Sequence, residues 1–596
     1  MKPRYMGDFE TTTKPTYQIE GRTRVWASCL VTIEEEPECV HLSNNLDDFM
    51  KFVSKTSCDV YFHNLKFDGE FIVSWILSHG YKYSNKTPRE EKTFDVVISS
   101  MGVWYMLKVY HKIWSKKIIS TTFYDSLKKL PMSVSKIAKS FNLPEQKLSI
   151  DYDEYRPIGH ELTEHEKQYV LNDVVIVAKA LHQQFKQGLK KMTVASDGMN
   201  FFKKDVLFGI GIGIDKFKAM FPILPLEYDN DVRRSYKGGW CYVNPIFQNK
   251  RVHGKTYDVN SLYPSVMYGL HGGLPYGVPR KFEGKYVHDE KFPLYIQKLS
   301  CWLTLKRGHL PTIQLKNTSR FLDNEYIKDS EGIVDLVLTN VDLKLMYEHY
   351  DVTNIEWCGG YKYRQNFKFF RKYIDFWMKV KIDSELSGNG GMRLIAKLML
   401  NALYGKFATK PRMKGKYPEM QDDGVVKYKT GEEEVKDPIY TALASFITSY
   451  ARSYTIRNAQ KNYDRFMYAD TDSLSLYGFE VPKSLKIDKT ELGKWKDEGD
   501  FQDGIFLRPK TYVKIKDGKT IITCAGMPKN VKDDLVTSAV GDDELSGTMK
   551  EGEFEIEGNH IFEMFTYGAS FHGKLVPKRV KGGVILETSD FTIKML

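Results

Sequence analysis

The chain has 596 residues, a length that predicts about three to five domains. Apolar residues make up 42% and charged residues 27% of the chain, which excludes a protein that is disordered throughout. Lys and Arg number 87 against 76 Asp and Glu, a net charge of +11. That charge favours a polyanionic partner, although a slightly basic enzyme of another kind is an equal alternative on charge alone.

Local composition excludes several other classes of protein. The most apolar stretch, 206–214, is far shorter than the roughly 20 residues that cross a bilayer. The N-terminus lacks the apolar segment of a secretory signal. The seven Cys form no C-x-x-C pair, which argues against a zinc module or a disulfide scaffold and fits a reducing cytosol. We therefore predict no membrane association.

The first 190 residues have an α/β pattern. Strand-like segments at 25–33 and 58–64 precede a helical apolar spacing at 164–185. Alternating strands and helices predict a layered α/β domain. A polar, Gly-bearing stretch at 188–198 is the predicted boundary of this domain.

The remaining chain is less regular and predicts an α+β organisation. Strand-like segments at 257–266 and 465–479 alternate with a strongly helical segment at 393–407. The polar, turn-rich segment 412–434 predicts a hairpin insertion. The Gly-rich, charged end of the chain, 540–596, predicts a small terminal subdomain.

Acidic residues of the first domain form one candidate site. Asp8 and Glu10 point to the same face of a predicted strand, and Asp68 lies among three Phe, where a carboxylate needs a partner or a metal. Tyr169 and Asp173 share one face of the predicted helix. Each piece alone could be a solvated edge or core packing. Together, the four carboxylates could hold two divalent cations for phosphodiester hydrolysis, with Tyr169 orienting the water.

The order D-x-E, N-x3-D, Y-x3-D resembles the three motifs of DnaQ-like 3′–5′ exonucleases, which have an RNase H-like fold. The resemblance implies metal ligands at Asp8, Glu10, Asp68 and Asp173. It also implies catalytic roles for Tyr169 and for Lys147, which would contact the scissile phosphate. The single-stranded primer end would be held by Thr11, His63, Asn64, Phe67, Ser126 and Leu127.

Three more carboxylates mark a second candidate site. Asp470 and Asp472 lie between two alternating apolar segments, which predicts a hairpin with both at its tip. Taken alone, this Asp-Thr-Asp could be a simple surface turn. Asp258 ends a predicted strand, and the Tyr-Pro that follows must turn the chain.

The helix predicted at 393–407 carries a stripe of functional side chains. At 100° per residue, Arg393, Lys397 and Tyr404 share one face, which alone could be a solvated surface. Nucleotidyl transfer needs carboxylate-bound metals, cations on the triphosphate and a flat group against the base or sugar. Asp258 and Asp472 would provide the carboxylates for the metals. Lys397 with Arg393 would provide the cations, and Tyr404 the flat group.

These segments resemble motifs A, B and C of family B DNA polymerases: D-x2-S-L-Y-P, K-x3-N-x2-Y-G and Y-x-D-T-D-S. The resemblance implies a right-hand palm, fingers and thumb. It implies two Mg²⁺ per active site, with Mn²⁺ as a possible substitute, held by Asp258, Val259 and Asp472, and a lesser role for Asp470. Nucleotide contacts would come from Val259, Tyr263, Arg393, Lys397 and Tyr404, with Tyr263 as the steric gate against a ribose 2′-hydroxyl.

Further motifs of the same family imply DNA contacts. Y-K-G-G at 236–239 resembles the motif that couples synthesis to proofreading, and T-x3-R and K-x-Y resemble primer-strand motifs. The implied DNA-binding residues of the polymerase part are Tyr236, Gly238, Gly239, Ser261, Asn401, Gly405, Thr448, Arg452, Thr471, Lys510 and Tyr512.

Nearly the whole chain is similar to the protein-primed polymerases of small tailed phages, the phi-29 type. This similarity implies an exonuclease domain at 1–194 and a polymerase domain at 195–596. Within the latter it implies palm at 195–269 and 442–545, a first insertion at 270–372, fingers at 373–408, a second insertion at 409–441 and thumb at 546–596. The first insertion would help to bind the terminal protein that primes synthesis, and the second would close a ring around DNA.

The same similarity implies a monomer that acts on primer–template DNA and dNTPs in the cytoplasm of a bacterial host. It also implies strand displacement. Two features depart from it: Arg393 stands where the nearest family members have Lys, and Glu385 replaces another Lys. The segment after Cys524 is also longer than the family's thumb. A nuclease that only binds DNA with its C-terminal part, a non-catalytic scaffold and an RNA-synthesising enzyme are the rival hypotheses.

Overall fold

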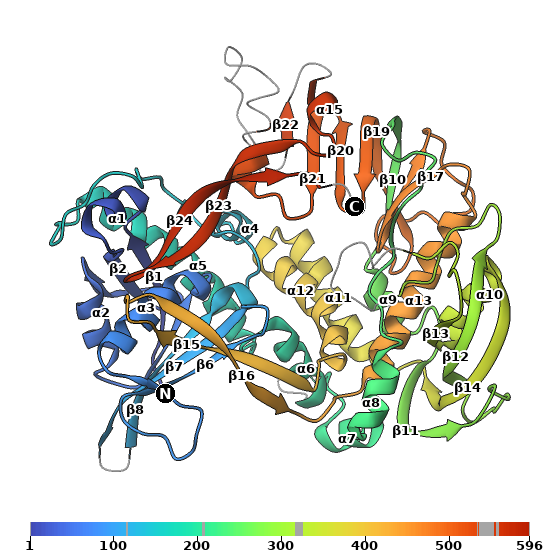
Figure 1. Cartoon of the computed structure of the whole chain (residues 1–596), viewed down its shortest axis with the longest axis horizontal. Helices are drawn as coiled ribbons and strands as arrows, with labels where there is room; N and C mark the ends of the chain where they lie inside the picture. The colour runs from blue at the N-terminus through green and yellow to red at the C-terminus, as the bar shows by residue number, and fades with distance from the viewer. Residues whose placement is uncertain are drawn as a thin grey trace.

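The computed structural model describes residues 2–114, 117–204, 209–315, 326–532, 535, 553–555 and 560–594. Figure 1 shows the N-terminal sheet at one side and a second large sheet across from it, with helices α11 and α12 between them. The mixed α/β multidomain class predicted from the sequence is confirmed. Within the described residues, no helix is both long and apolar enough to cross a membrane.

The N-terminal sheet has eight strands in the order β3-β2-β1-β4-β8-β7-β6-β5. Its strands are β1 Arg4–Thr11, β2 Val25–Thr32, β3 Cys39–Ser43, β4 Cys58–Phe62, β5 Lys82–Tyr83, β6 Thr93–Ile98, β7 Trp104–Trp114 and β8 Lys117–Asp125. The helices around it are α1 Lys14–Glu20, α2 Leu46–Val53, α3 Leu65–Ser78, η1 Ser126–Lys128, α4 Val134–Ser140 and α5 Glu164–Lys186. The predicted α/β pattern is therefore correct, including the strands near 25 and 58 and the long helix.

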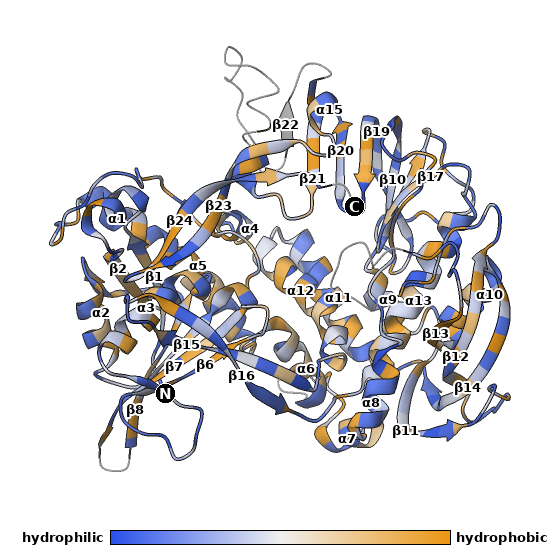
Figure 2. Ribbon diagram, in the orientation of Figure 1, coloured by the Kyte–Doolittle hydropathy of each residue, from blue (hydrophilic) through white to orange (hydrophobic). Residues whose placement is uncertain are grey.

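Both faces of this sheet are covered because its strands are apolar on both sides. Leu30 and Phe62 pack with Phe71 of α3 in one core, while Val31 packs with Val174 of α5 in another. Apolar stretches lie along the strands of both large sheets, as β6, β7 and β19 show in Figure 2. Burying two faces is what fixes α3 and α5 against opposite sides of β1.

The second large sheet has the order β22-β21-β20-β19-β10-β18-β17-β9. Its strands are β9 Cys241–Val243, β10 Arg251–Val259, β17 Phe466–Asp470, β18 Ser473–Tyr477, β19 Trp495–Arg508, β20 Thr511–Lys516, β21 Lys519–Cys524 and β22 Glu553–Glu555. Helices α9 Leu262–Tyr268 and α13 Thr441–Gln460 belong to the same core as this sheet. The predicted hairpin around the Asp-Thr-Asp is confirmed as β17 and β18.

The strand predicted at 257–266 is wrong in its second half. The strand stops at Val259, and Ser261, with a φ of 54°, caps helix α9. Pro264 lies in the first turn of that helix, where a missing N–H costs no hydrogen bond. The turn that the Tyr-Pro imposes is therefore a strand-to-helix turn.

A smaller sheet and several helices complete the part of the chain that follows the N-terminal domain. The smaller sheet has the order β11-β14-β12-β13 and carries α10. The bounds are β11 Leu274–Phe282, β12 Leu294–Leu305, β13 Val334–Thr339, α10 Asn340–His349 and β14 Tyr350–Asn366. The helices are α6 Val194–Lys204, α7 Ile214–Met220, α8 Leu226–Arg233, α11 Arg371–Leu386, α12 Gly390–Phe407 and α15 His560–Met564.

Two long hairpins reach the N-terminal domain from different parts of the molecule (Figure 1). They are β15 Arg412–Met420 with β16 Val426–Val435, which confirms the predicted hairpin, and β23 Ser570–Val580 with β24 Gly583–Thr592. Val426 and Val584 both join the core around α3. Part of the predicted terminal subdomain, 540–552, 556–559 and 595–596, lies outside the described residues. The domain limits remain predictions.

Candidate functional site

The four carboxylates of the N-terminal domain face one another from three elements. Asp8 and Glu10 lie on β1, Asp68 on α3 and Asp173 on α5. Burial, with repulsion from Asp173, raises the pKa of Asp8 to about 7. Burial and repulsion from Asp8 place the pKa values of Glu10 and Asp68 well above their usual range. Such carboxylates need a cation before all can be ionised.

Lys147 supplies one positive charge to this group. Its ammonium forms an ion pair with Asp173 Oδ2 and lies 3.4 Å from the Tyr169 hydroxyl, which in turn lies 2.6 Å from the hydroxyl of Tyr152. The other oxygen of Asp173 is buried, and no described residue forms a hydrogen bond with it. Burial raises the pKa of Asp173 even beside Lys147.

The residues expected to hold a primer end line the same edge of the sheet. His63 Nδ1 lies 3.0 Å from Ser126 Oγ, and burial lowers the pKa of this imidazole. Asp125 Oδ1 accepts hydrogen bonds from the backbone N–H groups of Asn64 and Leu127. The sequence analysis missed Asp125, which fixes both segments. Thr11 and Phe67 are half-buried beside them.

The second site forms where β10 ends beside the β17–β18 hairpin. Asp258 pairs across strands with Ser473, and Val259 N–H donates to Asp472 O at 2.8 Å. Burial, with repulsion from Asp472, raises the pKa of Asp258 to about 7. Burial also raises the pKa of Asp472. The two carboxylates therefore form a close, poorly solvated pair. Glu498, whose charge also acts on Asp258, was missed by the sequence analysis.

Asp470 has a different environment. The Lys510 ammonium lies 2.9 and 3.1 Å from its two carboxylate oxygens, and the Cys241 thiol lies 3.0 Å from Oδ1. Burial acts to raise its pKa, but these two donors outweigh burial and the net shift is downward. Asp470 is thus neutralised within the protein, which is consistent with the lesser role expected for it.

Two Tyr rings form a flat surface beside Asp258. Tyr263 of α9 and Tyr404 of α12 are stacked with centroids 4.4 Å apart and planes 12° apart. Asn401 and Gly405 are exposed on the same helix α12. The strand-to-helix turn at Ser261 is what brings Tyr263 to α12.

The cations on helices α11 and α12 differ from the expected set. Arg393 Nε lies 3.3 Å from Glu385 Oε2, so the two residues that depart from the family pattern form an ion pair with each other. Lys381, one turn earlier on α11, has its pKa lowered by burial and by the charges of Arg393 and Lys397. Lys381 is thus a second cation near Lys397. The sequence did not predict this role, because the position of Lys381 depends on how α11 packs on α12.

The Y-K-G-G segment is held by buried polar contacts. Arg452 donates to the carbonyls of Lys237 and Gly238 at 2.8 and 2.9 Å and to Asp342 of α10 at 2.6 Å. A Cβ at Gly239 would lie 2.4 Å from Thr471 Oγ1, so this position requires glycine. Arg452 is buried, and Thr448 is buried on the same helix. Arg452 therefore acts on the segment from within the protein, whereas the Thr448 hydroxyl donates to Ser445 O of its own helix.

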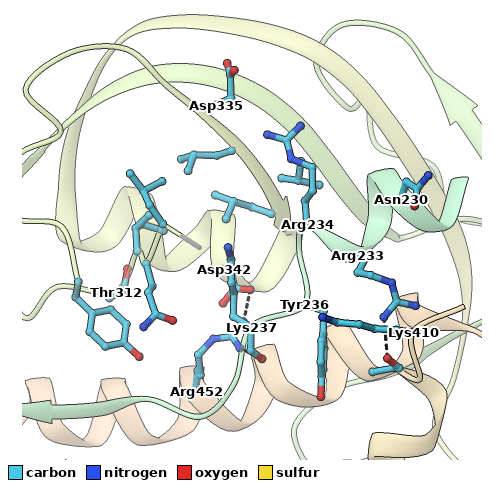
Figure 3. A pocket seen from close by; sticks show the side chains of 18 residues that line it. Asn230, Arg233, Arg234, Tyr236, Lys237, Thr312, Asp335, Asp342, Lys410 and Arg452 are labelled. Carbon is cyan, nitrogen blue, oxygen red and sulfur yellow. Dashed lines mark hydrogen bonds and ion pairs between the residues drawn. The ribbon is translucent and has the colours of Figure 1, made fainter. Parts of the chain in front are cut away.

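A cavity of about 500 Å³ lies next to this segment. In Figure 3, Arg233, Arg234, Lys237 and Lys410 come into it from α8, the Y-K-G-G segment and the chain after α12, opposite Asp335 of the smaller sheet. Tyr236 lines the same cavity. Its basic side, continuous with Y-K-G-G, suits a phosphate backbone. Tyr512 lies on β20, and Lys510, which contacts Asp470, comes just before this strand.

The donor chemistry of both sites fits divalent cations that prefer oxygen ligands. Each site offers buried carboxylates that repel one another, and Asp173 Oδ1 has no other partner. Across the described part of the chain, however, no three acidic, His or Cys side chains stand close enough to form a complete site by themselves. Water or a substrate phosphate would have to complete the ligand sets.

Comparisons with known proteins agree with this geometry. The family model for type B DNA polymerases, organellar and viral, matches residues 50–163 and 149–491. The chain therefore belongs to the type B DNA polymerases.

Comparison with individual relatives identifies the type of DNA polymerase. The DNA polymerase of Bacillus phage Nf is 44% identical, covering 98% of this chain and 99% of the relative, and that of Bacillus phage phi29 is 43% identical over 99% of each. A solved structure of phi29 DNA polymerase with primer-template DNA and incoming nucleotide substrates covers all of both chains at 42% identity, with a TM-score of 0.88. The polymerase is thus of the phi29 type, as its motifs indicated.

Proposed function

We propose that this polymerase adds dNTPs to a primer at Asp258 and Asp472 and removes misincorporated nucleotides, 3′ to 5′, at the N-terminal carboxylates. One observation carries the proposal: two separate groups of buried, mutually repelling carboxylates lie beside two different sheets. A synthesis site and a hydrolysis site in one chain are the arrangement that proofreading requires.

Asp258, Asp472 and the carbonyl of Val259 would hold two Mg²⁺, or Mn²⁺ in their place, and Asp8, Glu10, Asp68 and Asp173 would hold the pair of the exonuclease. Bound cations lower the pKa of the attacking hydroxyl or water and stabilise charge on the transferred phosphate. The chain's own part is to place the cationic and aromatic side chains. Lys397 and Lys381 face the triphosphate, and the Tyr263–Tyr404 pair packs against the sugar and base.

The proposed partners are primer–template DNA, dNTPs and a terminal protein whose hydroxyl starts synthesis. Support comes from the phi29 relative, whose solved complexes contain primer-template DNA, single-stranded DNA and incoming nucleotides. The basic cavity beside Y-K-G-G would bind the template backbone. The proposed enzyme acts as a monomer in the cytoplasm of a bacterial host, and it displaces the non-template strand as it synthesises.

Primer extension on a single-stranded circle separates the proposal from its rivals. Asp258→Asn should abolish extension and leave digestion of a single-stranded oligonucleotide within about twofold, since the exonuclease lies on another sheet. Asp8→Ala with Asp68→Ala should do the reverse, lowering digestion by at least about a thousandfold. Glu36→Gln, exposed on the first domain, is the matched control.

Each rival makes a different prediction in the same assay. Digestion without any incorporation by the unsubstituted protein would indicate a nuclease. Full extension by Asp258→Asn would remove Asp258 from the reaction. Equal use of rNTPs and dNTPs would contradict the steric role of Tyr263 and indicate an RNA-synthesising enzyme.

A further inference from the structure

A buried lysine lies in the second large sheet without a carboxylate bonded to it. The ammonium of Lys514, on β20, lies 2.9 Å from Thr256 Oγ1 and 3.0 Å from Ser475 Oγ. The two hydroxyls are 3.3 Å from each other. Lys514 forms no ion pair with a described residue, and the hydrogen bonds of its ammonium go to the two neutral hydroxyls.

Three aromatic rings enclose the same ammonium. Nζ lies 4.9, 5.2 and 5.0 Å from the ring centroids of Phe501, Phe506 and Tyr512. Ring faces attract a desolvated cation, but burial still lowers the pKa of Lys514 to about 7. An apolar side chain of similar length would fill this space at a lower cost in stability. Packing alone therefore does not explain why a lysine occupies this position.

The two hydroxyls belong to the strands that carry the polymerase carboxylates. Thr256 and Ser475 are directly paired across β10 and β18, and the next pair on the same face is Asp258 with Ser473. Lys514 reaches both from β20, on the far side of β19. Its ammonium thus bridges the two strands two residues before Asp258, and the residue after Asp258, Val259, donates its N–H to Asp472 O.

We propose that Lys514 is a positioning residue of the polymerase reaction, which holds β10 and β18 in the register that sets the separation of Asp258 and Asp472. The inference rests on the proposed roles of these two carboxylates. The aromatic rings link Lys514 to the residues expected to contact the primer strand. Tyr512 packs on Tyr468, whose hydroxyl accepts a hydrogen bond from Lys510 N–H.

Lys514→Met tests the proposal, with the exonuclease of the same molecule as the control for folding. Misplacement of two metal-binding carboxylates should lower single-nucleotide addition at saturating dNTP by roughly ten- to a hundredfold. The Mg²⁺ concentration for half-maximal addition should rise, while KM for dNTP and oligonucleotide digestion stay within about twofold. Lys514→Arg, which keeps the charge and donors, should recover most of the rate.

A matched core variant separates positioning from general destabilisation. Ile522→Val removes a methylene from the core of neighbouring β21 and should lower Tm without changing the Mg²⁺ dependence. If Lys514→Met does not fold, Thr256→Val with Ser475→Ala removes the two hydroxyls instead and should show the same Mg²⁺ shift. Addition at the normal rate and Mg²⁺ dependence, in either variant, would overturn the proposal.

The failure of this inference is distinguishable from failure of the proposed function. If Asp258→Asn is inactive but Lys514→Met is normal, only the positioning role is lost. If Asp258→Asn still extends primers, the assignment of the polymerase site itself is wrong.

Discussion

Individual carboxylates explain why both sites are expected to bind cations. Asp8 and Asp258 each have a pKa near 7 because they are buried beside another acid. In the unfolded chain the same groups ionise near pH 4. Folding therefore becomes less favourable as pH rises from the unfolded toward the folded pKa, by about 1.4 kcal/mol for each pKa unit and group.

This linkage predicts the pH dependence of stability in the metal-free protein. With chelator present, Tm should fall between pH 5.5 and about 8, because each buried acid must then ionise unpaired. Mg²⁺ should raise Tm more at pH 8 than at pH 5.5. Asp8→Asn and Asp258→Asn should each flatten the profile, whereas Asp517→Asn, exposed in a turn, should leave it unchanged. Scanning calorimetry in chelator and in Mg²⁺ checks this, and a Tm that rises with pH in chelator would contradict it.

Among single elements, α11 and α12 show how a departure from the family pattern is accommodated. Glu385 neutralises Arg393, so neither adds a net charge at the triphosphate. Lys381, half-buried and facing Lys397, compensates from one turn earlier. The motif on α12 alone contained no sign of this, because the residue comes from another helix.

We predict that Lys381 contributes to dNTP binding. Lys381→Met should raise KM for dNTP by roughly tenfold, since one charge–phosphate contact is lost, with a smaller effect on kcat. Lys379→Met is the control, because Lys379 is on the same helix, exposed and paired with Asp383. Glu385→Gln should lower KM by freeing Arg393. Steady-state single-nucleotide addition measures all three, and equal effects of the two lysine variants would refute the assignment.

Local patterns predicted most elements, because hydrophobic spacing is a local property. The strand of Asp8 and Glu10, the helix of Tyr169 and the hairpin of Asp472 all followed from spacing of two or four residues. The strand predicted through Pro264 was wrong, because alternation continued past a turn that depends on a positive φ at Ser261. Asp125, Lys381 and Lys514 act through packing between elements that are far apart in sequence, which no local pattern contains.

At the scale of the whole molecule, two hairpins join the polymerase part to the same patch of the N-terminal domain. The β23–β24 hairpin begins in the core of β20 and β21, where Phe571 and Phe591 pack. Its tip reaches β2 and α3: Thr23 N–H donates to Lys581 O, and a Cβ on Gly582 would lie 2.1 Å from Thr23 O. The β15–β16 hairpin arrives from the end of α12 (Figure 1).

One buried acid joins helix α3 of the N-terminal domain to both hairpins. Glu70 of α3 accepts hydrogen bonds from Tyr428 of β16 and from Arg579 of β23, both at 2.9 Å. The Arg579 guanidinium also lies 4.5 Å from the Tyr428 ring centroid. These contacts close a circuit from the second large sheet through both hairpins and the N-terminal domain. A closed circuit around DNA would keep the polymerase on its template between additions.

Opening this circuit should shorten products without slowing chemistry. Arg579→Met removes the ion-pair partner of the buried Glu70 carboxylate and leaves it the Tyr428 hydroxyl, which costs up to about 3 kcal/mol, less for a half-exposed partner. We expect products several times shorter in a single binding event on a primed circle with a DNA trap, with single-nucleotide addition within about twofold.

Lys578→Met is the matched control, since Lys578 pairs with Glu587 on the same hairpin and does not reach Glu70. Glu70→Gln with Arg579→Met should restore part of the length by removing the unpaired charge. Product lengths equal to those of the unsubstituted enzyme would show that the two hairpins stay closed without the ion pair, and would place the closing force in the apolar contacts of Val426 and Val584.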